Sequence, residues 1–458
     1  MTEPLWTSAG IATACDGAAS QPFDVTGVAF DSREVGKGDL FVALTGDNTD
    51  GHRFVPQALA QGAGGVLVSQ PVDGPHVLVA DTAAALDALG RAARARTDGV
   101  IIGVTGSVGK TSVKEALFAA LERGAPGGAH RSLKSYNNHV GVPLSLARMP
   151  AATRFGVFEM GMNHAGELAA LTQLVRPHVA LVTAVALAHG AFFANEAAIA
   201  DAKGEIFQGL EPGGTAVIPY DSPHRDRLIA AARPYAETIV TFGRDPDADV
   251  TAQEVVAGEA GTLVQARLRH ADLGFTLRPR GEHWVSNALA VLAVVEAAGG
   301  DLAAAGLALA DFAGLAGRGR RITLRLKGGD ALLIDESYNA NPASMRATLA
   351  MLGAEQARRK VAILGGMREL GPDEARHHAD LAGPIMAAGV GYALLVGTEM
   401  KPLAEALEGK IDFDHVADAA AAAKRAIALV SPGDAVLVKG SNAIGLAGVV
   451  DALAWTGF

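Results

Sequence analysis

The sequence predicts an α/β protein in which mainly parallel sheets are covered by helices. Short apolar runs such as DLFVAL, GGVLVS and DAVLVKGS alternate along the chain with amphipathic stretches of helical period. Glycine-rich turns separate the two kinds of segment, which is typical of strands and helices that follow one another in a parallel sheet. The length of 458 residues exceeds that of one ordinary domain and suggests about three, at about 150 residues each.

The first domain is expected to cover residues 1–92. Its strand-like runs are DLFVAL, GGVLVS and HVLVA, and the amphipathic segment HRFVPQALAQGA reads as a helix between them. A longer helical stretch, TAAALDALGRAARART, then leads into the next unit. This pattern predicts a small α/β unit that ends near residue 92.

The central domain is expected to cover residues 93–316. The runs RFGVFEM, HVALVTAV and GTAVIPY are apolar strands separated by helical stretches, as in a mainly parallel sheet covered on both faces. DVTAQEVV, TLVQARLR and GFTLRPR alternate without intervening helices, which predicts an antiparallel extension of that sheet. The helix SNALAVLAVVEAAG and the glycine-rich segment AGLAGRGRR close the domain.

The third domain is expected to cover residues 317–458. ALLIDES, KVAILGGM, YALLVG and DAVLVKGS are four apolar strands separated by helices. Such an alternation predicts a doubly wound, Rossmann-like arrangement.

Composition excludes several classes of protein. The formal net charge of −10 argues against a general nucleic-acid binder. No run of 18 or more apolar residues and no secretion signal occurs, so no membrane span is expected and we expect a cytoplasmic protein. The single cysteine, Cys15, rules out an intrachain disulfide and is expected to be a small buried residue rather than a nucleophile.

The segment GVTGSVGKTS carries the clearest chemical signal. It follows the apolar run VII and precedes the amphipathic stretch VKEALFAALE, so a strand, a tight turn and a helix follow in the order that a phosphate-binding loop needs. Backbone N–H groups and the helix dipole would face one anion, with a lysine charge and a threonine hydroxyl for Mg²⁺. The residues expected to hold phosphate are Gly106, Ser107, Val108, Gly109, Lys110, Thr111 and Ser112. The alternative is a glycine-rich turn without a ligand.

This loop departs from the general phosphate-loop pattern, because Val104 stands where the first glycine is expected. The variant TG-x-x-GKT resembles that of the Mur peptide ligases and folylpolyglutamate synthases. Further segments are similar to Mur ligase motifs, and together they extend the resemblance from about residue 25 to the KGS at 439–441: DSREVGKGDLFVALTGDNTDGHRFVPQALAQGA, SYNNHVGVPLSL, FEMGMNHAGEL, ADAKGEIFQGL and DESYNANPASM.

The resemblance implies an ATP-dependent ligase that forms an amide bond through an acyl phosphate. DESYNANP and EMGMNHAGE are most similar to the motifs of the family members that add D-alanyl-D-alanine to UDP-N-acetylmuramoyl-tripeptide. The expected product is the UDP-linked pentapeptide of peptidoglycan synthesis, made from small-molecule partners by a monomer. The alternatives are another Mur ligase, a folylpolyglutamate-type ligase, or a nucleotide-binding regulator without catalysis.

The resemblance also assigns catalytic and metal-binding residues. Lys110 would neutralise phosphate charge, and Thr111 and Glu159 would bind Mg²⁺, which prefers oxygen ligands. His189 would help to hold a second Mg²⁺, and Lys203 would be carbamylated, which requires a neutral amine. Without the resemblance, these last three side chains would read as a solvated carboxylate, a structural histidine and a surface lysine.

For the remainder of ATP, the resemblance points to residues on both sides of the boundary between the second and third domains. Asn287 would bind adenine, Asp335 the ribose hydroxyls, and Arg318 the γ-phosphate, while Tyr338 and Asn339 would lie near the base. The alternatives are a strand-end carboxylate for Asp335 and a loop cation for Arg318. Because these residues belong to different domains, ATP and substrate are expected to favour domain closure, which would exclude water.

The remaining assignments concern the substrates. Ser32, Arg33, Thr45 and Gly46 are candidates for the uridine diphosphate end, and Asn137 and Asn138 for substrate or metal-linked phosphates, unless the asparagines only shape a turn. Gly366 and Asn442 stand where aspartate and arginine are common in the family, which leaves the dipeptide specificity of the third domain open. The neighbouring His377 and His378 are expected at the surface. The third residue of the tripeptide, diaminopimelate or lysine, is not decided by the sequence.

Overall fold

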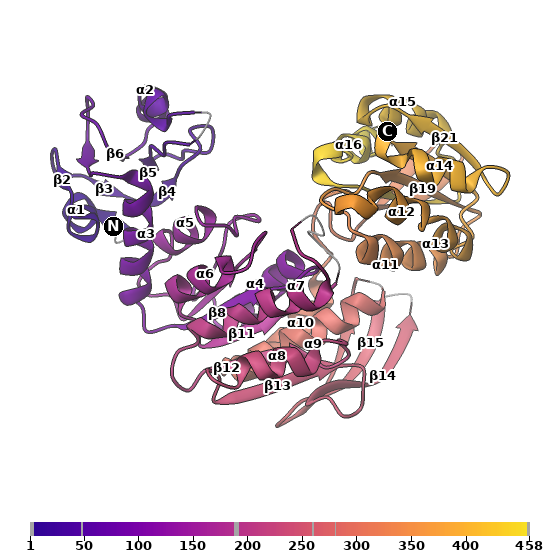
Figure 1. The fold of residues 1–458 in the computed structure, drawn as a ribbon, viewed down its shortest axis with the longest axis horizontal. Coiled ribbons are helices and arrows are strands. Elements are labelled where there is room, and N and C mark those ends of the chain that lie inside the picture. The colour runs from indigo at the N-terminus through magenta and orange to yellow at the C-terminus, as the bar shows by residue number, and fades with distance from the viewer. Residues whose placement is uncertain (1–3, 47–48, 187–191, 259–260, 280, 456–458) are drawn as a thin grey trace.

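Each predicted domain has a sheet of its own in the computed structural model (Figure 1), which describes residues 4–46, 49–186, 192–258, 261–279 and 281–455. The predicted α/β class, with its mainly parallel sheets, is confirmed.

The first domain is a five-stranded sheet in the order β2-β7-β6-β5-β4, in which β4 to β7 run parallel and β2 is antiparallel. The separate pair of β1 and β3 is antiparallel. The elements are β1 (Trp6–Thr7), α1 (Ser8–Cys15), β2 (Ala18–Ala19), β3 (Asp24–Val25), β4 (Gly27–Ala29), β5 (Asp39–Val42), η1 (Gly51–Phe54), α2 (Val55–Ala60), β6 (Gly65–Val68) and β7 (His76–Leu78).

The connection to the central domain is α3 (Thr82–Ala95), which packs against α1 on one side and α5 (Gly141–Ala147) on the other. Leu86 and Leu89 of this helix lie in the same apolar cluster as Leu144 of α5. The expected boundary at residue 92 therefore lies in the last turn of a helix that both domains use. The next sheet begins only at Val100.

The central domain is a nine-stranded sheet in the order β16-β15-β14-β13-β12-β11-β8-β10-β9. The strands from β9 to β14 in this order are parallel, and β14, β15 and β16 form the predicted antiparallel extension. The strands are β8 (Val100–Thr105), β9 (Ala129–Arg131), β10 (Phe155–Glu159), β11 (Val179–Val182), β12 (Thr215–Pro219), β13 (Thr238–Gly243), β14 (Val250–Gly258), β15 (Gly261–Arg267) and β16 (Asp272–Leu277).

Helices cover both faces of this sheet, because two separate apolar cores lie against it. One face carries α4 (Lys110–Gly124), α9 (Glu282–Ala297) and α10 (Leu302–Asp311). The other carries α5, α6 (Glu167–Val175), α7 (Glu196–Gly204), η2 (Glu205–Gly209) and α8 (Arg225–Ala232). A strand covered on both faces is apolar at successive residues, and β10 is buried along its whole length.

The third domain is a six-stranded sheet in the order β17-β18-β22-β19-β20-β21, parallel except for the edge strand β17. The strands are β17 (Arg320–Leu326), β18 (Gly329–Glu336), β19 (Arg359–Gly365), β20 (Tyr392–Val396), β21 (Asp412–Val416) and β22 (Asp434–Lys439). The four predicted strands are present. The two edge strands, β17 and β21, were not predicted, because their charged residues hide the strand pattern.

Two apolar cores again lie on the two faces of this sheet, as a doubly wound fold requires. The helices and short helical turns are α11 (Pro342–Gly353), η3 (Gly371–Asp373), α12 (Glu374–Ala379), α13 (Ala382–Ala387), η4 (Thr398–Met400), α14 (Lys401–Leu407), α15 (Ala419–Leu429), η5 (Asn442–Ile444) and α16 (Ala447–Trp455). In the described part of the chain no helix combines the length and the apolar character that crossing a membrane requires.

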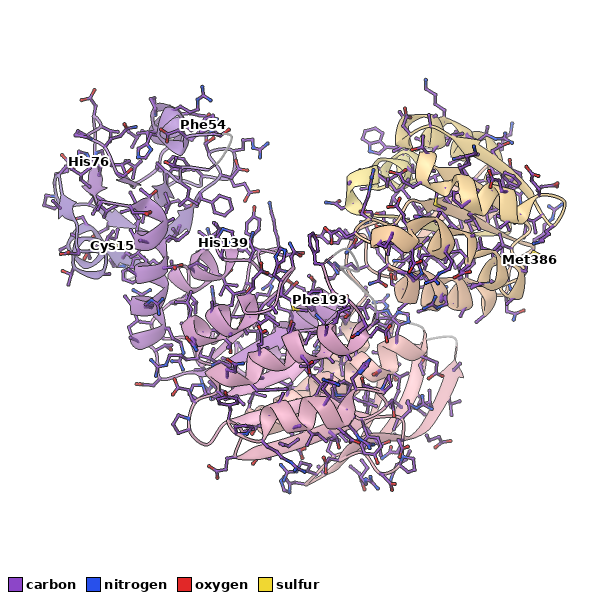
Figure 2. The ribbon with its side chains drawn as sticks, viewed as in Figure 1. Cys15, Phe54, His76, His139, Phe193 and Met386 are labelled. Atoms are coloured by element: carbon purple, nitrogen blue, oxygen red, sulfur yellow. The ribbon has the colours of Figure 1, made fainter. Side chains whose placement is uncertain are left out.

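Three residues outside the expected site were assigned from sequence: Cys15, His377, which is half-buried, and His378, whose assignment is wrong. Cys15 lies in the first domain (Figure 2) and is half-buried, where full burial was expected. Its thiol donates to the carbonyl of Ala85 at 3.3 Å, and burial raises its pKa to about 12, which disfavours the nucleophilic thiolate. His378 was expected at the surface but is fully buried. Its Nε2 accepts the backbone N–H of Met367 at 2.9 Å, so it supports the turn after β19.

Phe242 of β13 provides a test of the central core. Its side chain is 1% exposed and belongs to the core beneath α9, whereas Leu263 on β15 is 53% exposed. Replacing Phe242 with alanine is expected to lower the free energy of unfolding by about 3–5 kcal/mol through the lost burial and the cavity. Leu263→Ala is expected to change it by less than about 0.5 kcal/mol. Urea unfolding of both variants checks this, and equal losses would contradict the placement of the core.

Candidate active site

The glycine-rich loop joins β8, the third strand from one edge of the central sheet, to α4. Gly109 has φ 85, a left-handed conformation that favours glycine, and a Cβ on Gly106 would lie 1.9 Å from Oγ1 of Thr183. The loop is also tied to the end of β11: Ser107 Oγ donates to the carbonyl of Ala186 at 2.8 Å, and Thr183 Oγ1 to that of Val108 at 2.6 Å. The predicted strand, loop and helix are thus all present.

The strand that neighbours β8 on its other side brings a carboxylate to this loop. Glu159 is the last residue of β10 and pairs in register with Val104, just before the loop. Its side chain is 1% exposed; one oxygen accepts the hydroxyl of Thr111 and the other the side-chain amide of Asn137, both at 2.8 Å. A hydroxyl, a carboxylate and an amide thus meet at one point.

Two lysines lie on the same side of the pocket. The ammonium of Lys110 donates to the carbonyl of Gly106 at 2.7 Å, and burial lowers its pKa. Lys203, on α7, is 2% exposed, and its pKa is lowered well below the ordinary value, first by burial and then by the charge of Lys110. The amine of Lys203 is therefore readily neutral.

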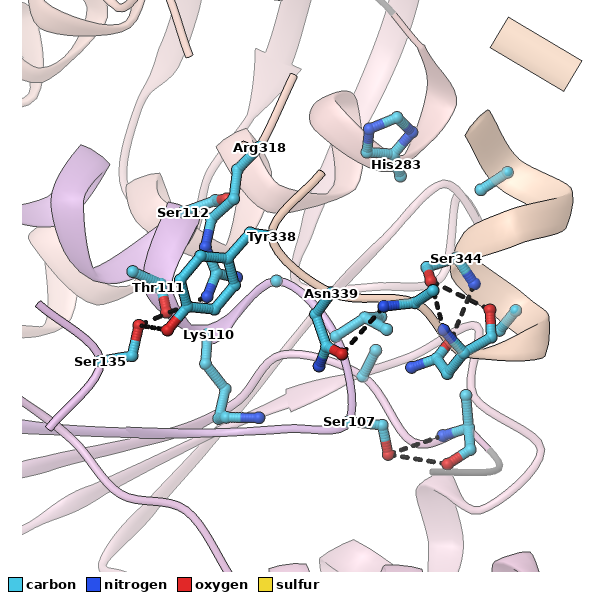
Figure 3. Close-up of a pocket in the computed structure, with 18 of the residues that line it drawn as sticks. Ser107, Lys110, Thr111, Ser112, Ser135, His283, Arg318, Tyr338, Asn339 and Ser344 are labelled. Carbon is cyan, nitrogen blue, oxygen red and sulfur yellow. Dashed lines mark hydrogen bonds between the residues drawn. The ribbon is translucent and has the colours of Figure 1, made fainter. Parts of the chain in front are cut away.

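These groups form the floor of a cavity of about 580 Å³ whose opposite wall belongs to the third domain (Figure 3). The guanidinium of Arg318 lies 3.9 Å from the ring centre of Tyr338, and both side chains contact Ser135 of the central domain. Of the residues assigned from the sequence, those that line the cavity are Ser107, Val108, Gly109, Lys110, Thr111, Ser112, Asn137, Glu159, Lys203, Asn287, Arg318, Tyr338 and Asn339.

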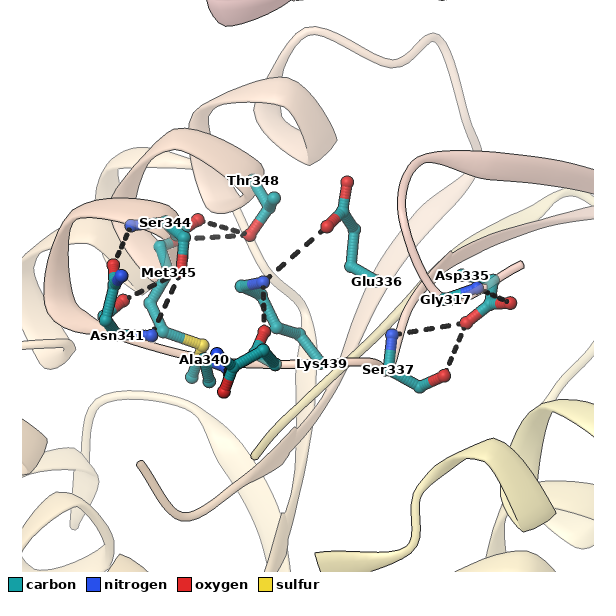
Figure 4. Close-up of polar contacts among 11 residues, drawn as sticks. Gly317, Asp335, Glu336, Ser337, Ala340, Asn341, Ser344, Met345, Thr348 and Lys439 are labelled. Atoms are coloured by element: carbon teal, nitrogen blue, oxygen red, sulfur yellow. Dashed lines mark hydrogen bonds and ion pairs between the residues drawn. The ribbon is translucent and has the colours of Figure 1, made fainter. Parts of the chain in front are cut away.

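Asp335 was expected in this cavity but does not line it. One of its carboxylate oxygens accepts the backbone N–H of Gly317 at 2.7 Å, and the other accepts the hydroxyl of Ser337 at 2.6 Å (Figure 4). Asp335 thus holds together the two loops that carry Arg318 and Tyr338. The next residue, Glu336, lines the cavity instead, because successive side chains of a strand point to opposite faces.

Glu336 and Lys439 form a buried pair that the sequence reading did not assign. Their side chains are 3.6 Å apart, and the Lys439 ammonium also donates to the carbonyl of Asn339 at 2.8 Å (Figure 4). Burial raises the pKa of Glu336 and lowers that of Lys439. Both residues belong to motifs noted in the sequence, Glu336 to DESYNANP and Lys439 to KGS. The motifs alone do not show which of their side chains faces the site.

Other predicted site residues lie elsewhere. His189 falls outside the described residues. Asn138 accepts the backbone N–H groups of Val140 and Gly141 at 3.2 and 2.9 Å, which is the turn-shaping alternative, and it does not line the cavity. Gly106 does not line the cavity; it lies against Thr183 at the start of the loop, where a side chain would not fit.

The four candidates for the uridine diphosphate end lie in the first domain, after β4 and β5. Since these parallel strands are neighbours, their following loops share one sheet edge. The guanidinium of Arg33 donates two hydrogen bonds to the carboxylate of Asp31, at 2.9 and 2.6 Å. This bidentate contact lowers the pKa of Asp31 to about 2. The hydroxyl of Ser32 donates to the side-chain oxygen of Gln57 at 3.4 Å. The backbone N–H of Gly46, the residue after Thr45, donates to the carbonyl of Thr49.

Gly366 and Asn442, which differ from the residues common in the family, follow the carboxyl ends of β19 and β22. A Cβ on Gly366 would lie 3.0 Å from the Cβ of Glu399, whose carboxylate is held by Arg368 at 2.5 Å. A carboxylate from η4, the helical turn after β20, therefore occupies the space beside Gly366. Asn442 is exposed in the turn after β22.

Comparisons with known proteins give one consistent result. The model described as Mur ligase family, catalytic domain, matches residues 24–103, the Mur ligase middle domain matches residues 104–295, and the Mur ligase glutamate ligase domain matches residues 320–442. The chain is 35% identical over 440 residues to the UDP-N-acetylmuramoyl-tripeptide–D-alanyl-D-alanine ligase of Escherichia coli, covering 94% of this chain and 95% of that one.

Solved structures agree. MurF from Acinetobacter baumannii has a TM-score of 0.85 at 31% identity, with 99% of each chain covered. MurF ligase from Thermotoga maritima, solved in complex with ADP, has a TM-score of 0.78 at 26% identity, covering 94% of this chain and 98% of that one.

A histidine in the cavity provides a pH-dependent test. Burial lowers the pKa of His283 to about 4. The unfolded chain takes up this proton near pH 6.5 and the folded chain only near pH 4, so the folded state loses stability as the pH falls between these values. We expect NMR titration of the His283 ring, assigned with His283→Gln, to give a value near 4, and the variant to lose less stability in this window. Titration near 6.5 would contradict the burial.

Proposed function

The chain belongs to the Mur ligase family, and we propose that it uses ATP to join D-alanyl-D-alanine to UDP-N-acetylmuramoyl-tripeptide. The product would be the UDP-linked pentapeptide of peptidoglycan synthesis. The observation that carries the proposal is the convergence of Lys110, Thr111, Glu159 and Lys203 in one cavity that faces Arg318. A regulator without catalysis has no chemical need for this set.

The chemistry takes two steps. The terminal carboxylate of the tripeptide attacks the γ-phosphorus of ATP, and ADP leaves as an acyl phosphate forms. The amine of D-alanyl-D-alanine then attacks the acyl carbon; phosphate leaves and the amine loses a proton. Lys110 and Arg318 would stabilise the charge on the moving phosphoryl group, which is the main service a protein gives to this reaction. The walls from two domains would keep water from the acyl phosphate.

The residues present fit a divalent cation at Glu159. Mg²⁺ prefers oxygen ligands, and the hydroxyl of Thr111 lies 2.8 Å from a carboxylate oxygen of Glu159 at the foot of the phosphate-binding loop. These two side chains would hold the ion, which would supply positive charge to the phosphates when bound. A second ion and the part of His189 in binding it stay predictions.

Carbamylation of Lys203 would add the missing anionic ligand. Among the described residues, no cluster of three or more acidic, histidine or cysteine side chains could hold a metal ion. Glu159 would therefore be the one carboxylate ligand from the described side chains. A carbamate forms only on a neutral amine, and the environment of Lys203 favours that form. The modification would replace a buried neutral amine with a buried anion beside Lys110.

We propose that the adenosine part of ATP binds between α9 and the loop after β18. The side-chain oxygen of Asn287 would lie only 3.0 Å from a Cβ on Gly109, so Asn287 adjoins the phosphate-binding loop. Asn287 would bind adenine, with Tyr338 and Asn339 near the base. We assign the ribose hydroxyls to Glu336 in place of Asp335, since Glu336 is the carboxylate that lines the cavity.

The remaining proposals concern the other substrates and the setting. Ser32, Arg33, Thr45 and Gly46 would bind the uridine diphosphate end, and the third domain would bind the dipeptide. We propose that the protein acts as a monomer in the cytoplasm.

Phosphate release tests the function directly. With ATP, Mg²⁺, UDP-N-acetylmuramoyl-tripeptide and D-alanyl-D-alanine, we expect release of ADP and phosphate together with a pentapeptide product identified by mass. Omitting either the tripeptide or the dipeptide should abolish product. Phosphate release that ignores the dipeptide would refute the assignment. Tripeptides with diaminopimelate or lysine as third residue, tested side by side, establish which is used.

Lys110→Met is the matched inactive variant for this assay. Loss of one preorganised cation is expected to lower kcat by about two to three orders of magnitude. Thermal unfolding should be little changed, because the loop is held by Ser107 and Thr183 through bonds that do not involve Lys110.

Carbamylation of Lys203 has its own test. In ¹³C-bicarbonate, we expect a protein carbamate signal in the ¹³C NMR spectrum that Lys203→Met abolishes. Because the amine is readily neutral, the signal should persist to a lower pH than that of an exposed lysine. Lys360→Met removes a lysine of β19 that does not line the cavity and should leave the signal intact. A signal that survives in Lys203→Met would refute the assignment.

A further inference from the structure

A short segment of the central domain contacts all three domains. Residues 132–138, called the bridging segment below, connect β9 to α5. Neighbouring side chains within it reach different partners: Lys134 and Tyr136 contact Glu34 of the first domain, and Ser135 contacts Tyr338 of the third. Asn137 contacts Glu159 at the floor of the cavity.

The first-domain contact lies beside the proposed uridine nucleotide site. Glu34 follows Ser32 and Arg33 directly, and its carboxylate accepts the hydroxyl of Tyr136 at 3.1 Å and forms an ion pair with Lys134. The ring of Tyr136 also packs against Phe30, with ring centres 5.4 Å apart. A shift of the loop at residues 30–34 would therefore move the bridging segment.

The third-domain contact lies at the proposed ATP site. Ser135 Oγ accepts the hydroxyl of Tyr338 at 2.8 Å and lies 3.4 Å from a guanidinium nitrogen of Arg318 (Figure 3). The ring and the guanidinium stack on each other, so Ser135 contacts them as one unit. Arg318, the residue proposed to bind the γ-phosphate, is thus in direct contact with the bridging segment.

The segment is held firmly between these contacts. Lys114 of α4 is fully buried, and its ammonium donates to the carbonyls of Ser132 and Lys134. Ser132 Oγ accepts the backbone N–H of Glu159 at 3.1 Å, and the carbonyl of Asn137 accepts that of Gly161 at 2.7 Å. The segment thus forms a contiguous network of contacts between the loop that carries Glu34 and the floor of the cavity.

We propose that Glu34 and Ser135 are positioning residues of the ligase reaction, which couple uridine nucleotide binding in the first domain to ATP binding by Arg318 and Tyr338. The ligands rest on the proposed function, whereas the connection between the two sites rests on the contacts above. A tripeptide substrate that orders the loop around Glu34 would place Ser135, and through it the Arg318–Tyr338 pair, for the nucleotide. By thermodynamic reciprocity, each ligand then raises the affinity for the other by the same factor.

Calorimetric titration of ADP, with and without saturating UDP-N-acetylmuramoyl-tripeptide, measures that factor. In the unmodified protein we expect the tripeptide to strengthen ADP binding at least about 5-fold, the lower end of ordinary coupling between sites. Glu34→Gln and Ser135→Ala should each reduce the factor to below about 2. The double variant should lose no more than either single one, because both changes break the same connection. A residue with only a structural role would weaken both ligands without changing the factor.

Asp311→Asn serves as the matched control. Asp311 forms an ion pair of 2.5 Å with Arg123, away from the bridging segment, and its loss should leave the factor unchanged. A factor near 1 in the unmodified protein, or a full factor in Glu34→Gln and Ser135→Ala, overturns the coupling while ligase activity still supports the function. A protein that shows no binding when the tripeptide itself is titrated, and that forms no pentapeptide, overturns both.

Discussion

The site depends on the position of β8 between β10 and β11. Parallel strands end at the same sheet edge, so the loop after β8, the carboxylate at the end of β10 and the segment after β11 meet at one place. The register between Glu159 and Val104 brings the hydroxyl of Thr111 within 2.8 Å of that carboxylate. A slip of one residue in this pair would turn Glu159 to the opposite face and separate it from the loop.

The cavity holds more positive charge than its own carboxylates balance. The cations of Lys110, Arg318 and Lys439 line it against the carboxylates of Glu159 and Glu336, and the amine of Lys203 is readily neutral. Buried cations without partners are costly, which is why burial lowers the pKa of the three lysines. A polyphosphate with its cation, and a carbamate on Lys203, would each supply the missing negative charge. The charge imbalance is therefore a cost to the empty protein that its ligands are suited to relieve.

The division into three domains gives this site its dependence on more than one ligand. The floor comes from the central sheet and one wall from the third domain, while Glu34 of the first domain contacts the bridging segment beside the floor. A site made of separate bodies is complete only when those bodies are correctly placed, which is useful where an acyl phosphate must be kept from water. The bonds made by Lys114 and Asp335 are the fixed points of this arrangement, since they hold the loops that meet between the domains.

The sequence by itself determined the features that are local. Apolar runs predicted the inner strands of the first and third sheets, and those of the central sheet except β13. The spacing of Gly106, Gly109, Lys110 and Thr111 predicted the tight turn between β8 and α4, and the motifs pointed to the family. These succeed because a strand, a turn or a helix start depends mainly on neighbouring residues. Tertiary structure decided the rest: that Glu336 faces the cavity while Asp335 ties two loops, that His378 is buried, and that Ser135 and Lys439 join the site. Each of these depends on which face a side chain presents to a distant segment, and only the packed chain brings those segments together.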